Sequence, residues 1–101
     1  MWELAMHDQE SWAAAESVAV ATTNGETVLL DRRRGNYFVL NESGAVIWRL
    51  VRRPGGATIS EIVAALDAEY DAPVERLRSD AVALLDRLRR DRLVSCRRVA
   101  A

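Results

Sequence analysis

The sequence predicts an α+β domain in which a three-stranded antiparallel sheet is followed by three helices. Residues 18–41 alternate in the manner of β-strands between turn-forming residues, which indicates the sheet. From residue 42 onward the apolar residues recur at helical spacing instead, which indicates the helices. The chain has 101 residues, of which 50% are hydrophobic, and this fits one domain around one core.

The first part of the chain is predicted to form an antiparallel meander. Residues 18–22 alternate between larger β-formers and alanine, and Asn24-Gly25 follows them. Both turn residues tolerate a positive φ, so this pair favours a type I′ hairpin. The second strand is expected at residues 27–30. After a polar turn over residues 31–35, the β-branched and aromatic residues 36–41 form the third strand.

The first helix is predicted to begin after the third strand and to end at Pro54-Gly55-Gly56. Either Asn41 or Ser43 can cap its N-terminus, because both side chains accept hydrogen bonds from free helical N–H groups. Its apolar stripe consists of Ala45, Trp48 and Val51, widened by Val46, Ile47 and Leu50.

The second helix is predicted to start at Thr58 or Ser60. Thr58 followed three residues later by Glu61 matches a capping box. The helix breaks at residues 71–73, and Pro73 suits the first position of the next helix. The apolar residues of the second helix are Ile59, Ile62, Val63 and Leu66, with Tyr70 at its end.

The third helix is predicted to be the longest, and residues 93–99 are compatible with a short closing strand. Its apolar stripe consists of Val74, Leu77, Ala81, Leu84, Leu85 and Leu88. The resulting order of three strands and three helices has the parts of a winged helix-turn-helix domain.

Residues 1–15 are expected to be an N-terminal arm outside the domain, which we place at residues 16–101. Trp2, Met6 and Trp12 stand among polar neighbours there without a clear period. This pattern fits a flexible arm or a short helix, and the tryptophans suggest that the arm docks on this domain or on a partner.

Composition narrows the functional class. Fourteen basic and 15 acidic residues give a formal charge of -1, which argues against a general polyanion binder. The single cysteine, Cys96, excludes an internal disulfide and fits a reducing cytosol. No apolar run approaches the roughly 20 residues that a membrane helix needs, and the N-terminus lacks the pattern of a signal peptide. We therefore expect a cytoplasmic protein that binds neither membrane nor nucleic acid.

Catalytic, metal and cofactor sites are not expected. His7 is the only histidine and has no cysteine or histidine partner at metal-ligand spacing. The glycines do not form a phosphate-binding loop. The run Arg32-Arg33-Arg34 is the strongest basic feature, and it fits either a solvated turn or a contact for an acidic partner.

Three segments resemble the PqqD-like proteins, which recognise precursor peptides in pathways for ribosomally synthesised and modified peptides. Residues 40–48 resemble the family pattern LN-x-x-G-A-x-I-W, and residues 58–62 resemble T-x-x-E-I. Residues 80–94 resemble its third helix and exit, with Ala81 in place of valine and Arg92 in place of the usual glycine. Residues 29–31 and 35–38 also resemble the standalone members found in lasso-peptide pathways.

The resemblance implies a non-catalytic protein that binds the leader segment of a precursor peptide as an added strand between the third strand and the third helix. It also implies delivery of the precursor to a leader peptidase and a macrolactam cyclase. A free strand edge offers unpaired backbone groups, and a neighbouring helix offers side-chain pockets. The expected peptide-binding residues are Leu30, Asn36, Tyr37, Phe38, Val39, Leu40, Val74, Leu77, Asp80, Ala81, Leu84 and Arg87.

Two other functions remain open from the residues alone. A winged-helix DNA-binding regulator would place a helix in the major groove and arginines on phosphates. A protein scaffold without leader specificity is the third reading. The chain is expected to be a monomer, with a dimer as the alternative.

Overall fold

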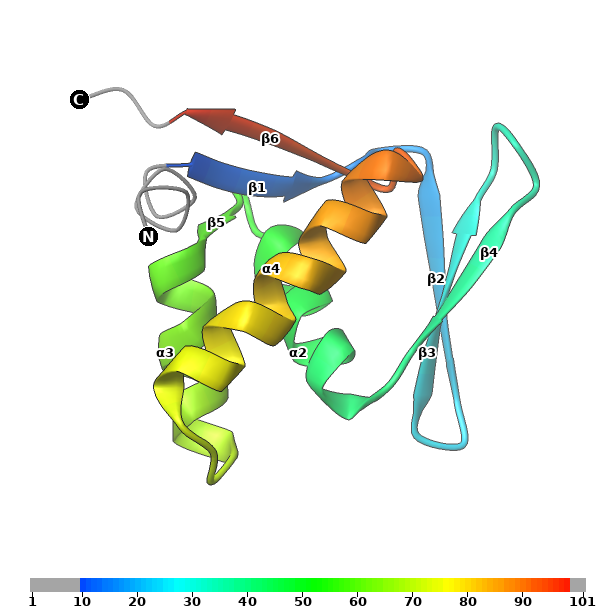
Figure 1. Cartoon of the computed structure of the whole chain (residues 1–101). Helices are drawn as coiled ribbons and strands as arrows, with labels where there is room; N and C mark the ends of the chain where they lie inside the picture. The colour runs from blue at the N-terminus through cyan, green and yellow to red at the C-terminus, as the bar shows by residue number, and fades with distance from the viewer. Residues whose placement is uncertain (1–9, 99–101) are drawn as a thin grey trace.

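The computed structural model describes residues 10–98, which form two small antiparallel sheets around three helices (Figure 1). The fold class predicted from the sequence is confirmed, with a second sheet added. The elements in chain order are β1 (Glu10–Ala14), β2 (Val18–Thr23), β3 (Glu26–Asp31), β4 (Tyr37–Leu40), α2 (Glu42–Val51), β5 (Ala57–Thr58), α3 (Ile59–Glu69), α4 (Val74–Arg90) and β6 (Val94–Arg98).

The predicted meander is present as the sheet β2-β3-β4. Asn24 and Gly25 have φ values of 50° and 80°, and Thr23 pairs with Glu26 on either side of them. This two-residue turn with both φ values positive is the one that the Asn-Gly pair favours. Asp31 closes the second turn, because its side-chain Oδ1 accepts a hydrogen bond of 3.0 Å from the backbone N–H of Arg33.

The second sheet has the order β5-β1-β6 and joins segments that are far apart in the sequence. Its central strand is β1, so Glu10–Ala14 belong to the folded unit and are neither an arm nor a helix. Trp12 is 1% exposed and pairs with Ala57 on one side and Cys96 on the other. The remainder of the expected arm, residues 1–9 with Trp2, Met6 and His7, lies outside the described residues.

Helix starts follow the predicted caps closely. Asn41 is the cap of α2, and its side chain accepts a 2.9 Å hydrogen bond from the N–H of Gly44. Thr58 caps α3 in a complete capping box with Glu61. The hydrogen bond from the backbone N–H of Thr58 lowers the pKa of the Glu61 carboxyl. Pro73 precedes α4 as its N-cap and is not its first helical residue, so this detail of the prediction was wrong by one position.

The end of α4 has Arg92 at the position where the PqqD-like pattern that it resembles has glycine. Arg92 adopts a left-handed φ of 62°. The N–H of Arg92 donates to the carbonyl of Arg89 at 3.0 Å, and the N–H of Leu93 donates to that of Leu88 at 2.9 Å. This is the Schellman arrangement, formed here by an arginine at the position that favours glycine. The helix therefore stops at the expected place and β6 follows directly.

The core lies between α2, α3 and α4 and the inner faces of both sheets. The sheet β2-β3-β4 contributes Leu29 and Leu40, and the sheet β5-β1-β6 contributes Trp12, Ala57 and Val94. On α4 the buried residues are Leu77, Ala81, Leu85 and Leu88, whereas Leu84 is only partly buried. One side of α4 thus belongs to the core, and the side next to β4 is left partly open.

Candidate functional site

The strand β4 is an edge strand with β3 as its pairing partner in the sheet order β2-β3-β4. Figure 1 shows α4 running diagonally across the helical layer, with the sheet that contains β4 beside it. An unpaired strand edge next to a helix is the geometry that an extended peptide uses when it adds a strand to a sheet.

The register of β3 and β4 determines which backbone groups point to the free edge. The N–H of Asp31 donates to the carbonyl of Asn36 at 2.8 Å, so these opposite residues form a hydrogen-bonded pair. Paired residues alternate along an antiparallel ladder, and Leu29 opposite Phe38 is therefore the next hydrogen-bonded pair. It follows that Tyr37 and Val39 direct their N–H and C=O groups away from β3, toward the free edge.

A groove of about 830 Å³ lies along the first half of α4. The predicted residues Leu77, Asp80, Ala81 and Leu84 all line it, so the structure brings this group together. Ala81 is a small residue with no exposed surface, and Leu84 is an apolar residue that is partly buried. The α4 side of this groove is therefore apolar at these two positions. We call this hollow the α2-side pocket; its other lining residues are Asn41, Glu42, Ser43, Ile47, Leu66, Tyr70, Asp71, Ala72 and Arg76.

A second hollow of about 440 Å³ lies at the other end of β4. The predicted residues Asn36, Tyr37, Phe38 and Arg87 line it. We call it the turn-side pocket because it adjoins the β3–β4 turn; its other lining residues are Arg34, Gly35, Arg90, Asp91 and Leu93.

Phe38 connects the strand to the helix. Its ring lies under the guanidinium carbon of Arg87, 5.2 Å from the ring centroid, which is a cation–π distance. Arg87 and Leu84 are one turn apart on α4. The two pockets therefore follow one another along α4, with Leu84 in the first pocket and the Phe38–Arg87 contact in the second. Asn41, which directly follows β4, lines the first pocket, and Tyr37 and Phe38 of β4 line the second.

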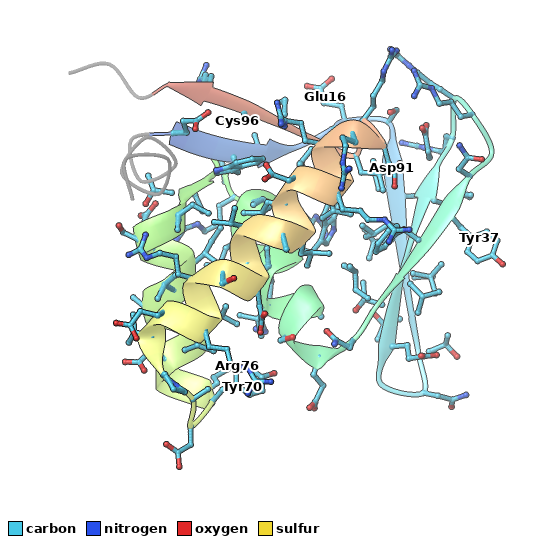
Figure 2. All side chains as sticks on the ribbon, viewed as in Figure 1. Glu16, Tyr37, Tyr70, Arg76, Asp91 and Cys96 are labelled. Atoms are coloured by element: carbon cyan, nitrogen blue, oxygen red, sulfur yellow. The ribbon has the colours of Figure 1, made fainter. Side chains whose placement is uncertain are left out.

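Five of the predicted residues lie elsewhere or contribute in another way. Tyr37 is 72% exposed and Figure 2 shows it pointing away from the helices. Leu30 pairs with Tyr37 and shares that outer face, as does Val39, so these side chains do not line the α4 groove. Leu40 is 2% exposed and belongs to the core, and Val74 is exposed outside both pockets.

Tyr70 reports on the electrostatics of the α2-side pocket. Partial burial, and then the carboxylates of Glu42 and Glu69, raise the pKa of its phenol above the ordinary value. The neutral phenol can donate a hydrogen bond in the α2-side pocket, which it lines. Figure 2 shows Tyr70 and Arg76 next to each other where α3 passes into α4.

Tyr70, Ser43 and Ile47 also line the α2-side pocket and were not predicted from the sequence. Tyr70 comes from the end of α3 and the other two from the start of α2, so only the packing of three helices brings them to one place. One sequence signal pointed there, because the break at residues 71–73 forces the chain to turn where Tyr70 ends its helix.

Residues 10–98 contain no group of three or more His, Cys, Asp or Glu side chains that could hold a metal ion. Over the same residues, none of the helices is both long and apolar enough to span a bilayer. The thiol of Cys96 donates to Glu10 at 2.6 Å, and burial, followed by this contact, raises the pKa of the thiol to about 12. Cys96 is thus a protonated structural residue of the second sheet.

Fold and site together define a small α+β domain with an open strand edge beside a helical groove. Comparison by sequence places the domain: the family described as "Coenzyme PQQ synthesis protein D (PqqD)" matches residues 26–94. The chain belongs to this family. No curated protein matches the chain by sequence.

Two solved structures resemble the whole domain. One is described as "TbiB1 in Complex with the TbiA(beta) Leader Peptide"; it is 30% identical, the match covers 82% of this chain and 94% of that one, and the TM-score is 0.71. The other is described as "Lasso peptide synthetase B1 complexed with the leader peptide"; it is 27% identical, with coverage of 84% and 98% and a TM-score of 0.71. Both matches thus span nearly the full length of the solved chains.

Proposed function

We propose that this chain is a non-catalytic recognition protein that binds the leader segment of a ribosomally synthesised precursor peptide. The observation that carries the proposal is the free edge of β4 with a pocket lined by α4 residues at each of its two ends. The two similar structures, both in complex with leader peptides, support the same ligand class.

In binding by strand addition, backbone hydrogen bonds and side-chain contacts make separate contributions. The N–H and C=O groups of Tyr37 and Val39 pair with the peptide backbone and give affinity that depends little on sequence. Alternate peptide side chains then point toward α4 and enter the groove. Leu77 and Leu84 provide apolar contacts there, and Ala81 leaves space for a larger peptide side chain.

Asp80 has a polar role in this proposal. Its carboxylate is exposed and lies 4.0 Å from Arg76 Nε, a contact with both side chains about three-quarters exposed. Such an exposed pair contributes little to stability, so Asp80 can exchange its partner for a peptide cation or N–H at small cost. Asn36 and Arg87 provide the polar contacts at the turn-side pocket.

The direct experiment begins with a search for a short precursor gene beside the gene of this chain, and it titrates the fluorescently labelled leader of that precursor, with Leu84→Arg as the test variant. We expect saturable micromolar or tighter binding to the wild type and a loss of at least about a hundredfold in the variant, because a charge would enter the apolar groove. Ala83→Arg is the matched control, since Ala83 is exposed on the same helix outside the pocket.

Circular dichroism of both variants checks that helix content is unchanged. If Leu84→Arg binds the leader as well as Ala83→Arg does, the groove is misplaced. If the wild type shows no saturable binding, the proposed function is wrong and a scaffold role without leader specificity becomes the better reading.

We propose further that the bound precursor is delivered to a leader peptidase and a macrolactam cyclase. A peptide on the α4 side of β4 leaves the outer face of the sheet uncovered, with Leu30, Tyr37 and Val39 exposed on it. Exposed apolar residues gathered on one face are typical of protein contacts. We expect Leu30→Glu to retain leader affinity and to slow leader removal in a reconstituted reaction; unchanged cleavage would contradict this assignment.

The DNA-binding alternative is not favoured. The apolar side of α4 is committed to the core through Leu77, Ala81, Leu85 and Leu88. Two arginines of α4 lie next to acidic residues of the same helix, Arg76 with Asp80 and Arg89 with Asp86. A helix of mixed charge is a poor match for a phosphate backbone. Tight, sequence-specific retardation of DNA in a gel-shift assay at low salt would contradict the leader-binding proposal.

A further inference from the structure

The two pockets that flank the β4 edge carry opposite charges. The turn-side pocket is lined by Arg34, Arg87 and Arg90 against the single carboxylate of Asp91. The α2-side pocket is lined by Glu42, Asp71 and Asp80 against the single cation Arg76. Each pocket therefore has a formal excess of two charges, which is positive in the turn-side pocket and negative in the α2-side pocket.

The arginines of the turn-side pocket are available to a ligand. Within residues 10–98, no carboxylate forms an ion pair with Arg34, Arg87 or Arg90. Arg87 lies over the Phe38 ring, a contact that leaves the edge of its guanidinium group free to donate hydrogen bonds. The neighbouring turn adds the exposed residues Arg32 and Arg33, which strengthen the positive potential at this end.

The carboxylates of the α2-side pocket are only partly neutralised. Arg76 contacts Asp80 at 4.0 Å, whereas Glu42 and Asp71 have no ion-pair partner in the described part of the chain. Glu42 also contributes, after partial burial, to the raised pKa of the Tyr70 phenol in the same pocket.

The two ends are far enough apart to act separately. β4 has four residues, and at roughly 3.3 Å per residue its length is about 13 Å. The Debye length at physiological salt is about 8 Å, so a charge at one end is largely screened from the other. The total charge of -1 conceals this separation, because the opposite excesses cancel in the sum.

We propose that the paired charged pockets set the register of the bound peptide. The ligand they select is an extended segment with acidic residues over Arg34, Arg87 and Arg90, and basic residues over Glu42, Asp71 and Asp80. This inference rests on the proposed leader binding and deepens it. Backbone pairing alone allows the peptide to slip along β4, because its hydrogen bonds do not depend on sequence, and two opposite charges hold one alignment.

The first measurement uses the labelled leader with two charge-reversing variants. Arg90→Glu changes the turn-side pocket and Asp71→Lys changes the α2-side pocket. Arg97→Glu and Asp67→Lys are the matched controls, because both residues are exposed and line neither pocket. At 50 mM NaCl we expect each pocket variant to weaken binding at least about fivefold and each control to stay within about twofold.

The second measurement is a charge exchange between protein and peptide. A leader derivative with lysine in place of the acidic residues at one end of the binding segment should bind the wild type weakly and Arg90→Glu more tightly. At 500 mM NaCl the differences among all these proteins should shrink to less than about twofold, because the contacts are exposed to salt.

The outcomes separate the two proposals. If Arg90→Glu and Asp71→Lys bind the leader as their controls do while Leu84→Arg still loses it, the charge proposal is overturned and leader binding stands. If the exchanged pair shows no recovery, the assigned alignment is overturned. If the wild type does not bind the leader at all, both proposals fail together.

Discussion

The two sheets of this domain are built in opposite ways and serve different purposes. The sheet β2-β3-β4 is a meander of neighbouring segments, with an edge open beside α4. The sheet β5-β1-β6 joins residues up to 88 positions apart, as in the pair of Glu10 with Arg98. Its central strand carries a fully buried tryptophan. The difference suggests that one sheet presents backbone to a ligand and the other closes the domain.

The structural role of the second sheet is tested by Trp12→Ala, for which we expect the largest effect. Removing this buried side chain should lower the free energy of unfolding by about 3–5 kcal/mol. Urea denaturation followed by circular dichroism measures the loss, and Trp12→Phe is the control that retains most of the volume. A loss below about 1 kcal/mol would show that β1 is dispensable and that the division between the sheets is wrong.

The ligand-facing role of the first sheet is tested by a pair of prolines. Val39→Pro removes an N–H that points to the free edge, and we expect leader affinity to fall about tenfold with moderate loss of stability. Phe38→Pro removes an N–H that pairs with β3, so we expect a clearly larger drop in the melting temperature. Val39→Thr keeps the N–H and is the control. The reverse ranking of the two prolines would place the opposite backbone groups at the edge.

Arg92 lies between α4 and β6, and its replacement by glycine is expected to have a smaller, stabilising effect. Arg92 holds a left-handed backbone that disfavours any side chain with a Cβ. Arg92→Gly should therefore raise the free energy of unfolding by about 0.5–1 kcal/mol, with leader affinity unchanged because the residue lies outside both groove pockets. Arg92→Ala separates the charge from the backbone effect, and a stabilisation equal to that of glycine would exclude the conformational explanation.

The smallest expected effect on stability comes from Cys96, and it appears only above neutral pH. Its pKa is raised to about 12 in the fold, from an ordinary value of 9.0, so the folded state keeps the thiol proton. The associated stability is fully present below pH 9 and is lost as the pH rises toward 12. Between pH 8 and pH 10.5 the urea midpoint of the wild type should fall more than that of Cys96→Ala. Equal losses would indicate that the thiol does not titrate differently in the two states.

Local signals predicted the meander and the helices well. Asn24-Gly25 forms the expected turn, and Asn41 and Thr58 are the caps. Four of the six residues in the predicted α4 stripe are buried, whereas Val74 is exposed and Leu84 is partly buried. Each depends on residues within about one turn or one hairpin, so their side chains carry the information locally. The strand β1 left no such signal, because Glu10–Ala14 becomes a strand only when distant β5 and β6 supply its partners.

The candidate site also has parts that local sequence signals predicted and parts that they did not. Turn signals and periodicity were enough to predict the free third strand and the amphipathic third helix. Helical spacing also placed Leu77, Asp80, Ala81 and Leu84 on one helix face. The sequence did not determine the parity of β4, which a hydrogen bond between Asp31 and Asn36 decides. The separation of charge between two pockets was equally invisible, because it depends on which carboxylates and arginines the packing of α2, α3 and α4 brings together. Periodicity and capping act over a few residues, whereas a groove exists only between elements, and its shape and potential follow from tertiary packing.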